Sequence, residues 1–259
     1  MTTMIVAARV ELTKILWRTK YKMLLFVCAL LCVPAGLLSL LGVRTDVATF
    51  TLPNAAFNTL SVFTAVVLPL IIFMLAADVY THEIENKSIK CVLTRPVGRL
   101  TIFLSKAAAI LCYAAIVLGL VFLVSASFQF LSSGRVLDEA SRAFTAEQLL
   151  EAGAALAAYA LSVVPMAAFV ATAAFLAVLI PSPSLTMFLN IVAYIALSAV
   201  GALSTEVGAV LYTSYTGWYR MWMGGGMPPL RLITTLLLLV SHIAIFLAGG
   251  YLLFDRKDV

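Results

Sequence analysis

The amino-acid sequence predicts an all-α integral membrane protein. We expect six transmembrane helices, an N-terminal interfacial amphipathic helix and a cytoplasmic coupling helix between spans two and three. Composition is the first observation, because 63% of the 259 residues are hydrophobic and only 11% are charged, against about 25% charged in soluble proteins. The second is a series of uncharged segments long enough to cross about 30 Å of hydrocarbon. We expect a single membrane domain over residues 1–259, because the stretches between the spans are too short for a separate soluble domain.

The six spans follow from apolar length and from the positions of proline. We place them at about 23–43, 59–79, 105–131, 152–180, 185–203 and 232–254. The uncharged stretch 152–205 is too long for one crossing, and residues 181–184 (PSPS) divide it, because prolines next to small polar residues favour a tight break.

The segment 3–19 precedes the first span and is too short and too charged to cross the membrane. As a helix it carries a polar stripe of Glu11, Lys14 and Arg18. The opposite side carries the apolar residues Ile5, Ala8, Leu12 and Leu16. We expect this helix to lie in the cytoplasmic interface, with Trp17 at headgroup depth.

The basic residues set the expected orientation. Twelve of the 17 Lys and Arg fall in segments that we place inside, and five fall in segments that we place outside. Cytoplasmic segments of membrane proteins carry such an excess. We therefore expect a multi-pass protein, in a bacterial plasma membrane, with both termini cytoplasmic. The net charge of +5 is organised by membrane side, so it does not indicate nucleic acid as a partner.

Residues 81–106 form a basic interruption between spans two and three, and their order predicts more than a plain connecting loop. Glu83 and Lys87 are spaced for a helical ion pair. Pro96 should stop this helix at about Thr94, because the residue before a proline avoids the α region. A short amphipathic helix of this kind suggests a docking element for a soluble partner. The alternative is a solvated loop that only marks the inner side of the membrane.

This segment also resembles the cytoplasmic signature of a known family, the ABC-2 type permeases. The similar positions are Glu83, residues 92–94 (VLT), residues 96–99 (PVGR) and Lys106. The order of elements along nearly the whole chain is similar too. The sequence departs from the family before Ser88, where a glycine is common and this chain has Lys87.

The resemblance implies an ATP-driven exporter in which this chain is the membrane subunit. A second permease copy or a close paralogue would complete the substrate path, and two separate ABC ATPase subunits would bind the cytoplasmic elements. The residues implied in ATPase coupling are Glu83, Lys87, Pro96, Arg99 and Lys106. Glu83 would pair with Lys87 or with the ATPase, while Arg99 and Lys106 would tie the start of span three to lipid phosphate or to the N-terminal helix.

ATP itself is expected on the partner. The sequence contains no G-x-x-x-x-G-K-[ST] phosphate loop. We therefore expect no cofactor on this chain, and ATP and Mg²⁺ on the partner ATPase. Catalysis by this chain is not indicated, because His82-Glu83 is not followed by the second histidine of a metalloprotease motif.

An aromatic segment, residues 204–231, precedes the last span. Its centre is crowded with Tyr and Trp, which prefer the membrane interface. The rings are those of Tyr212, Tyr215, Trp218, Tyr219 and Trp222. We expect one or two short helices here that form an outer lid over the substrate path, with residues 224–226 (GGG) as a hinge. The alternative is a purely structural interfacial anchor.

Few polar side chains lie within the spans. His242 and Asn190 are candidates for lining a cavity. For His242 the alternative is a hydrogen bond across helices, for instance to Asn190 or to a backbone carbonyl. Cys28 and Cys32 share a helix face, but no histidine or carboxylate is near them in sequence, so we predict two buried thiols and no metal site.

The low polarity of the spans suits a hydrophobic or amphipathic cargo, and we favour a peptide antibiotic or a similar amphipathic compound. The alternatives are an ion or lipid exporter of the same architecture, and an ATP-independent channel or secondary transporter. The last class usually places ionisable groups near the midplane, and the sequence has almost none there.

Overall fold

The computed structural model of the chain describes residues 2–40, 55–85, 98–136, 146–223 and 229–256, and the regular elements in these ranges are all helices. The predicted all-α fold is therefore confirmed. Several of these helices are long and apolar enough to cross a membrane, as a multi-pass protein requires. The candidate spans are Ala56–Thr81, Arg99–Phe128, Ala152–Leu179, Pro183–Leu203 and Leu230–Arg256.

Two helices open the chain. Helix α1 (Thr2–Trp17) ends where the chain bends at Arg18, and α2 (Thr19–Leu40) begins directly after the bend. The predicted first span, 23–43, falls on α2, whose described part ends at Leu40. It is not among the five candidate spans, so the count of six stays a prediction.

A continuous helical rod follows, which we call the α3–α5 rod. It contains two π-helical turns, each with the wider i→i+5 hydrogen-bonding pattern. In chain order its parts are α3 (Ala55–Val62), η1 (Phe63–Val67), α4 (Leu68–Ala76), η2 (Ala77–Thr81) and α5 (His82–Glu85). The predicted coupling helix thus starts as an extension of this rod. Its remainder, with Lys87 and Pro96, lies outside the described residues.

Helix α7 (Arg99–Val136) begins six residues earlier than the predicted third span. Next come α8 (Ala146–Leu161) and α9 (Val163–Leu179), which divide the predicted fourth span at Ser162. Pro165 explains this division, because proline has no N–H to donate to the carbonyl of Leu161 one turn earlier.

The chain breaks between Leu179 and Pro183, at the predicted proline-serine segment, and α10 (Pro183–Leu203) follows. Three short helical pieces then lead to the last helix, which begins at Pro229. These elements are α11 (Thr205–Gly208), η3 (Tyr212–Tyr215, a 3₁₀ turn), α12 (Tyr219–Met223) and α13 (Pro229–Arg256).

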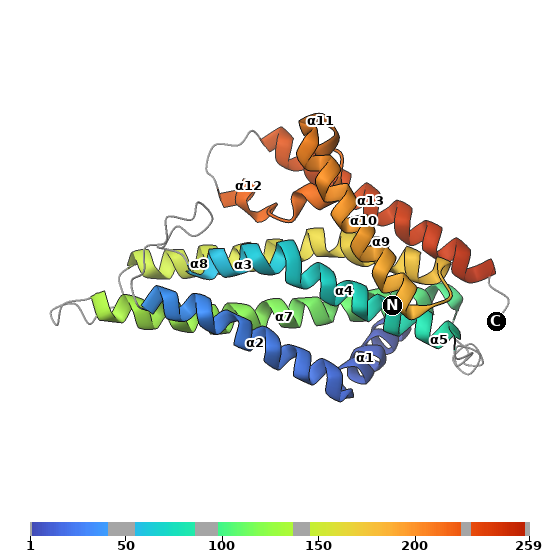
Figure 1. Cartoon of the computed structure of the whole chain (residues 1–259), viewed down its shortest axis with the longest axis horizontal. Coiled ribbons are helices and arrows are strands. Elements are labelled where there is room, and N and C mark those ends of the chain that lie inside the picture. Colours follow the sequence, from blue (N-terminus) through green and yellow to red (C-terminus); the bar gives the residue numbers. More distant parts are fainter. Residues whose placement is uncertain (1, 41–54, 86–97, 137–145, 224–228, 257–259) are drawn as a thin grey trace.

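Figure 1 shows α2, α7, the α3–α5 rod and the α8–α9 pair lying lengthwise together, with α10 to α13 packed over one face. Helix α9 is the central element, because it packs against α13, α4 and α7. Close packing of α13 depends on Gly250, where a Cβ atom would lie only 2.9 Å from Cζ of Phe103 on α7. Small residues allow such close approach between membrane helices.

Candidate functional site

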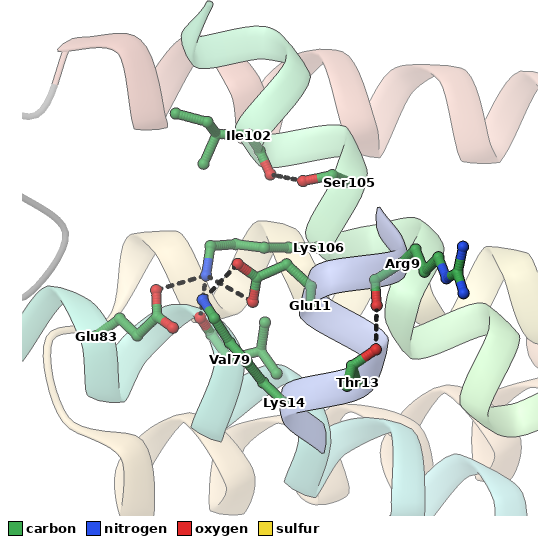
Figure 2. A network of polar contacts seen from close by, with 9 residues as sticks. All are labelled: Arg9, Glu11, Thr13, Lys14, Val79, Glu83, Ile102, Ser105 and Lys106. Atoms are coloured by element: carbon green, nitrogen blue, oxygen red, sulfur yellow. Dashed lines mark hydrogen bonds and ion pairs between the residues drawn. The ribbon is translucent and has the colours of Figure 1, made fainter. Parts of the chain in front are cut away.

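The most unusual side chain in the bundle is Lys106, in the second turn of α7, whose side chain is fully buried. Its ammonium group donates to the carboxylate of Glu83 at 2.5 Å and to the carbonyl of Val79 at 3.0 Å. The carboxylate of Glu11 lies 3.9 Å away. Figure 2 shows these groups converging from three segments, and we call Glu11, Val79, Glu83 and Lys106 the Lys106 cluster. A buried ammonium group requires this kind of compensation.

Glu11 brings α1 into the Lys106 cluster. Its carboxylate also accepts a hydrogen bond from Lys14 at 2.7 Å. Glu11 is the buried member of the predicted polar stripe of α1, since Lys14 and Arg18 are exposed. On the apolar side, Leu12 and Leu16 pack partly buried against the core. Glu11 departs from the exposed stripe because the buried ammonium group of Lys106 attracts its carboxylate, while the location of α1 in the cytoplasmic interface stays a prediction.

A second polar contact joins the same end of the α3–α5 rod to α2. The Lys20 ammonium group and the Tyr21 hydroxyl both donate to the carboxylate of Asp78. Tyr113 on α7 donates to the backbone carbonyl of Tyr21 at 2.9 Å. Burial, followed by the Asp78 carboxylate, raises the pKa of the Tyr21 phenol, which therefore stays protonated and able to donate.

The η2 turn distributes these contacts around the rod. The hydroxyl of Tyr80 donates to the carbonyl of Phe103 on α7 at 2.7 Å, and the hydroxyl of Thr81 donates to the carbonyl of Ala177 on α9 at 2.8 Å. Asp78 and the Lys106 cluster add contacts with α2 and α1. Residues 78–83 of the rod therefore contact four helices, which are α1, α2, α7 and α9. A displacement of this stretch would therefore act on four helices.

Arg99 contacts the last helix, while its predicted contact with lipid phosphate stays a prediction. Its guanidinium group donates to the backbone carbonyl of Asp255 at 2.6 Å and lies 3.9 Å from that side chain. It thus ties the start of α7 to the end of α13, and not to the N-terminal helix. Lys106 does reach the N-terminal helix, through Glu11. Lys87 and Pro96 lie outside the described residues, so their predicted roles stay predictions.

The five aromatic residues predicted as a lid do lie together. In the part of this segment that the structure describes, residues 204–223, four of the rings are buried and that of Trp222 is 45% exposed. The Trp218 indole donates to the hydroxyl of Thr235 on α13 at 3.1 Å, and Tyr212 packs edge-on against Phe169 of α9 at 4.9 Å. We call residues 204–223 the outer segment.

The outer segment also contacts the α3–α5 rod. Arg220 donates to the hydroxyl of Ser61 at 2.6 Å, and the ring of Tyr219 stacks on Phe57 at 6.5 Å. The segment therefore covers one end of the bundle, opposite the end that holds Lys106. Whether it opens as a lid stays a prediction.

His242 and Asn190 do not meet within the described structure. The Asn190 amide donates to the carbonyl of Thr186 in its own helix at 2.9 Å. The imidazole of His242 lies between the rings of Tyr212 and Phe246, with centroids at 4.3 and 4.4 Å, and its Nε2 atom is buried without a hydrogen-bond partner among the described residues. The suggested bond between the two side chains is therefore wrong.

The chemistry of the site is that of a fixed ionic connection. The sequence indicates Lys106 and Glu83 as site residues, but it does not indicate Glu11 and Asp78. The missed signal was Glu11 as the single carboxylate of the N-terminal helix. Among the described residues, no group of three or more His, Cys, Asp or Glu side chains could hold a metal ion.

The comparison with known families supports this choice of region. The sequence model of a family described as "ABC-2 family transporter protein" matches residues 8–193. This match includes the whole Lys106 cluster and Asp78, and it ends before the outer segment and α13. No curated protein matches the chain.

Proposed function

This chain belongs to the ABC-2 family of transporter proteins, and we propose that it is the permease subunit of an ATP-driven exporter whose ATPase subunits are separate chains. Members of the family are transport membrane subunits, which usually work with ABC ATPase partners. The observation that carries the proposal is the Lys106 cluster, which lies within the matched region and joins α1 and α7 to the stretch of the α3–α5 rod that leads into the predicted coupling helix.

The proposed coupling begins where the partner ATPases push on the coupling helix. Glu83 lies in α5, at the described start of that helix, and holds Lys106 at 2.5 Å. Separating a buried ion pair leaves uncompensated charge and costs about 3–5 kcal/mol. The cluster therefore moves as a unit, and α1, α7 and the rod tilt together between inward- and outward-open states.

We further propose that two permease subunits enclose the path, with the outer segment of each as its lid. The support is the position of this segment across the end opposite the Lys106 cluster, and its contacts with both the rod and α13. The proposed export direction rests on the family resemblance alone. The proposed cytoplasmic location of both termini is supported by the excess of basic residues in the segments placed inside.

The proposed cargo is a peptide antibiotic or another amphipathic compound. Its support is the scarcity of charge within the candidate spans, which suits a cargo that moves laterally from lipid. An ion or lipid exporter of the same architecture is the alternative. Growth of a deletion strain against a panel of membrane-active compounds would distinguish these cargoes, and sensitivity to no compound would contradict the antibiotic.

The function is tested with an ABC ATPase sought in the reading frames next to the gene of this chain, co-expressed with it and reconstituted into lipid nanodiscs. We expect the two to co-purify and the permease to raise the ATPase rate. Glu83→Gln keeps the side-chain shape but weakens its hold on Lys106, so it should abolish most of this stimulation at unchanged expression. Lys22→Gln is the control, because Lys22 is exposed on α2 and lies outside both the Lys106 cluster and the outer segment.

Two outcomes contradict the proposal. Hydrolysis of ATP by the purified chain alone would show that the ATPase is not a separate chain. Failure of any ATPase to co-purify would contradict the proposal that this chain is part of an ATP-driven exporter. Equal stimulation by the Glu83→Gln and Lys22→Gln variants would leave the exporter in place but exclude Glu83 from coupling.

A further inference from the structure

The two π turns of the α3–α5 rod each receive a side chain from α10. The Tyr194 hydroxyl donates to the carbonyl of Ala65 in η1. Two turns earlier on α10, the hydroxyl of Thr186 lies 3.2 Å from that of Thr81 in η2. One helix thus contacts the rod at both places where its hydrogen-bonding pattern changes.

Pro69 explains the first contact. A proline has no N–H, so Pro69 cannot donate to the carbonyl of Ala65 one turn earlier, and its ring pushes that carbonyl aside. An unpaired carbonyl within a membrane protein must find another donor. Tyr194 supplies it, and the packing of its ring against Phe73 and Phe169, at 6.2 and 5.4 Å, aims the hydroxyl at this oxygen.

The second contact is buried as well. Thr81 and Thr186 are both 0% exposed. Thr81 donates to the carbonyl of Ala177 on α9 and so accepts from Thr186. The Thr186 hydroxyl has the carbonyl of Ser182, the N-cap of α10, as an alternative acceptor at 2.9 Å. The η2 turn is therefore held between α9 and α10 as well as by the Lys106 cluster.

The piece of the rod between the two turns is packed too tightly to bend. On α4, Leu68, Ile72 and Leu75 are 0% exposed and Phe73 is 1% exposed. Close-packed interiors transmit displacement and do not absorb it. We therefore expect bending at η1 and η2, because sharp bends in helices occur at proline and at π turns.

We propose that α10 braces the α3–α5 rod, with Tyr194 as the positioning residue of η1 and Thr186 as that of η2. Release of the Ala65 carbonyl by Tyr194 lets α3 swing relative to α4. Because Arg220 and Tyr219 attach the outer segment to α3, this swing carries the outer segment with it. The last step alone rests on the proposed function, whereas the brace is a property of this chain by itself.

The test is hydrogen–deuterium exchange of the full-length chain, measured by mass spectrometry. Tyr194→Phe keeps the ring and removes only the hydroxyl, so amide exchange in peptides covering 60–68 should become about fivefold faster, the factor expected for one lost hydrogen bond. Thr186→Val should speed exchange in peptides covering 78–84 and leave 60–68 unchanged. The matched control is Tyr251→Phe, because the Tyr251 ring packs on Phe103 and its hydroxyl has no hydrogen bond among the described residues.

Each outcome decides one part of the proposal. Unchanged exchange at 60–68 in Tyr194→Phe, or an equal rise in both regions for both variants, overturns the brace. With the ATPase bound, ATP should change exchange in the outer segment of the wild type, and this response should be altered in Tyr194→Phe. A local effect at 60–68 without any ATP response would retain the brace and count against the proposed function.

Discussion

Lys106 is the residue that organises the end of the bundle where the chain begins. A lysine at this depth is destabilising unless opposite charge and hydrogen-bond acceptors surround it. Glu83, Glu11 and the Val79 carbonyl provide them, and each comes from a segment that must be in place for the cluster to form. The cluster therefore fixes the relative positions of these segments more than it adds net stability.

Replacement of Lys106 by methionine should be strongly destabilising, because it leaves the Glu83 and Glu11 carboxylates without their shared cation. We expect a loss of about 3–5 kcal/mol in the free energy of unfolding, measured by thermal denaturation in detergent. Lys22→Met is the control, since Lys22 is exposed on α2, and it should change stability by less than about 0.5 kcal/mol.

The double variant Glu83→Gln/Lys106→Met sharpens this prediction. Removal of both charges leaves neither partner as an uncompensated ion. The double variant should therefore be more stable than the sum of the two single changes predicts. Strict additivity would show that the two side chains do not interact in the folded protein.

The sequence predicts only part of the Lys106 cluster. Glu83 and Lys106 are identified because they belong to a recurring sequence signature, although their contact with each other is not evident from spacing. Glu11 is missed because a helical wheel places it with Lys14 and Arg18 on a polar stripe. Only the three-dimensional position of Lys106 shows that Glu11 faces the protein.

At the scale of elements, the helices follow from apolar length and proline, but the irregular turns do not. Pro165 divides a predicted span at Ser162, and residues 181–184 separate α9 from α10 as their composition predicts. The π turns η1 and η2 depend on partners in other helices, such as Tyr194 and Thr186, so no local pattern in the sequence identifies them.

The outer segment offers a test of its packing at two neighbouring positions. Thr213 is 6% exposed whereas Ser214 is exposed, and cysteine is close in size to both. On a background without the native cysteines, Ser214→Cys should react quickly with a membrane-impermeant maleimide and Thr213→Cys slowly. Equal, rapid labelling of both would mean that the segment is a solvated loop, and the lid would be excluded.

At the scale of the whole molecule, both ends of the chain lie at one end of the bundle. Arg99 and Lys106 are seven residues apart on α7, and they contact Asp255 near the C-terminus and Glu11 near the N-terminus. The predicted even number of crossings would place both ends on one side of the membrane as well, although one of the six predicted spans is not among the five candidates.

This arrangement predicts that tags at the two termini are accessible from the same side of the membrane. In intact cells, a protease or antibody added outside should reach neither tag, and permeabilisation should expose both. Access to one tag only, before permeabilisation, would contradict both the even count and the shared location of the ends.

The Lys106 cluster also has a consequence for biosynthesis. The chain is made from its N-terminus, so Glu11, Asp78 and Glu83 are present before Lys106 has been synthesised. Until the third-span helix arrives, the two glutamates lack their buried cation and are better solvated by water than by hydrocarbon. We therefore expect the N-terminal helix to dock fully only after α7 has inserted. Lys106 then completes the contacts that join α1 to the α3–α5 rod.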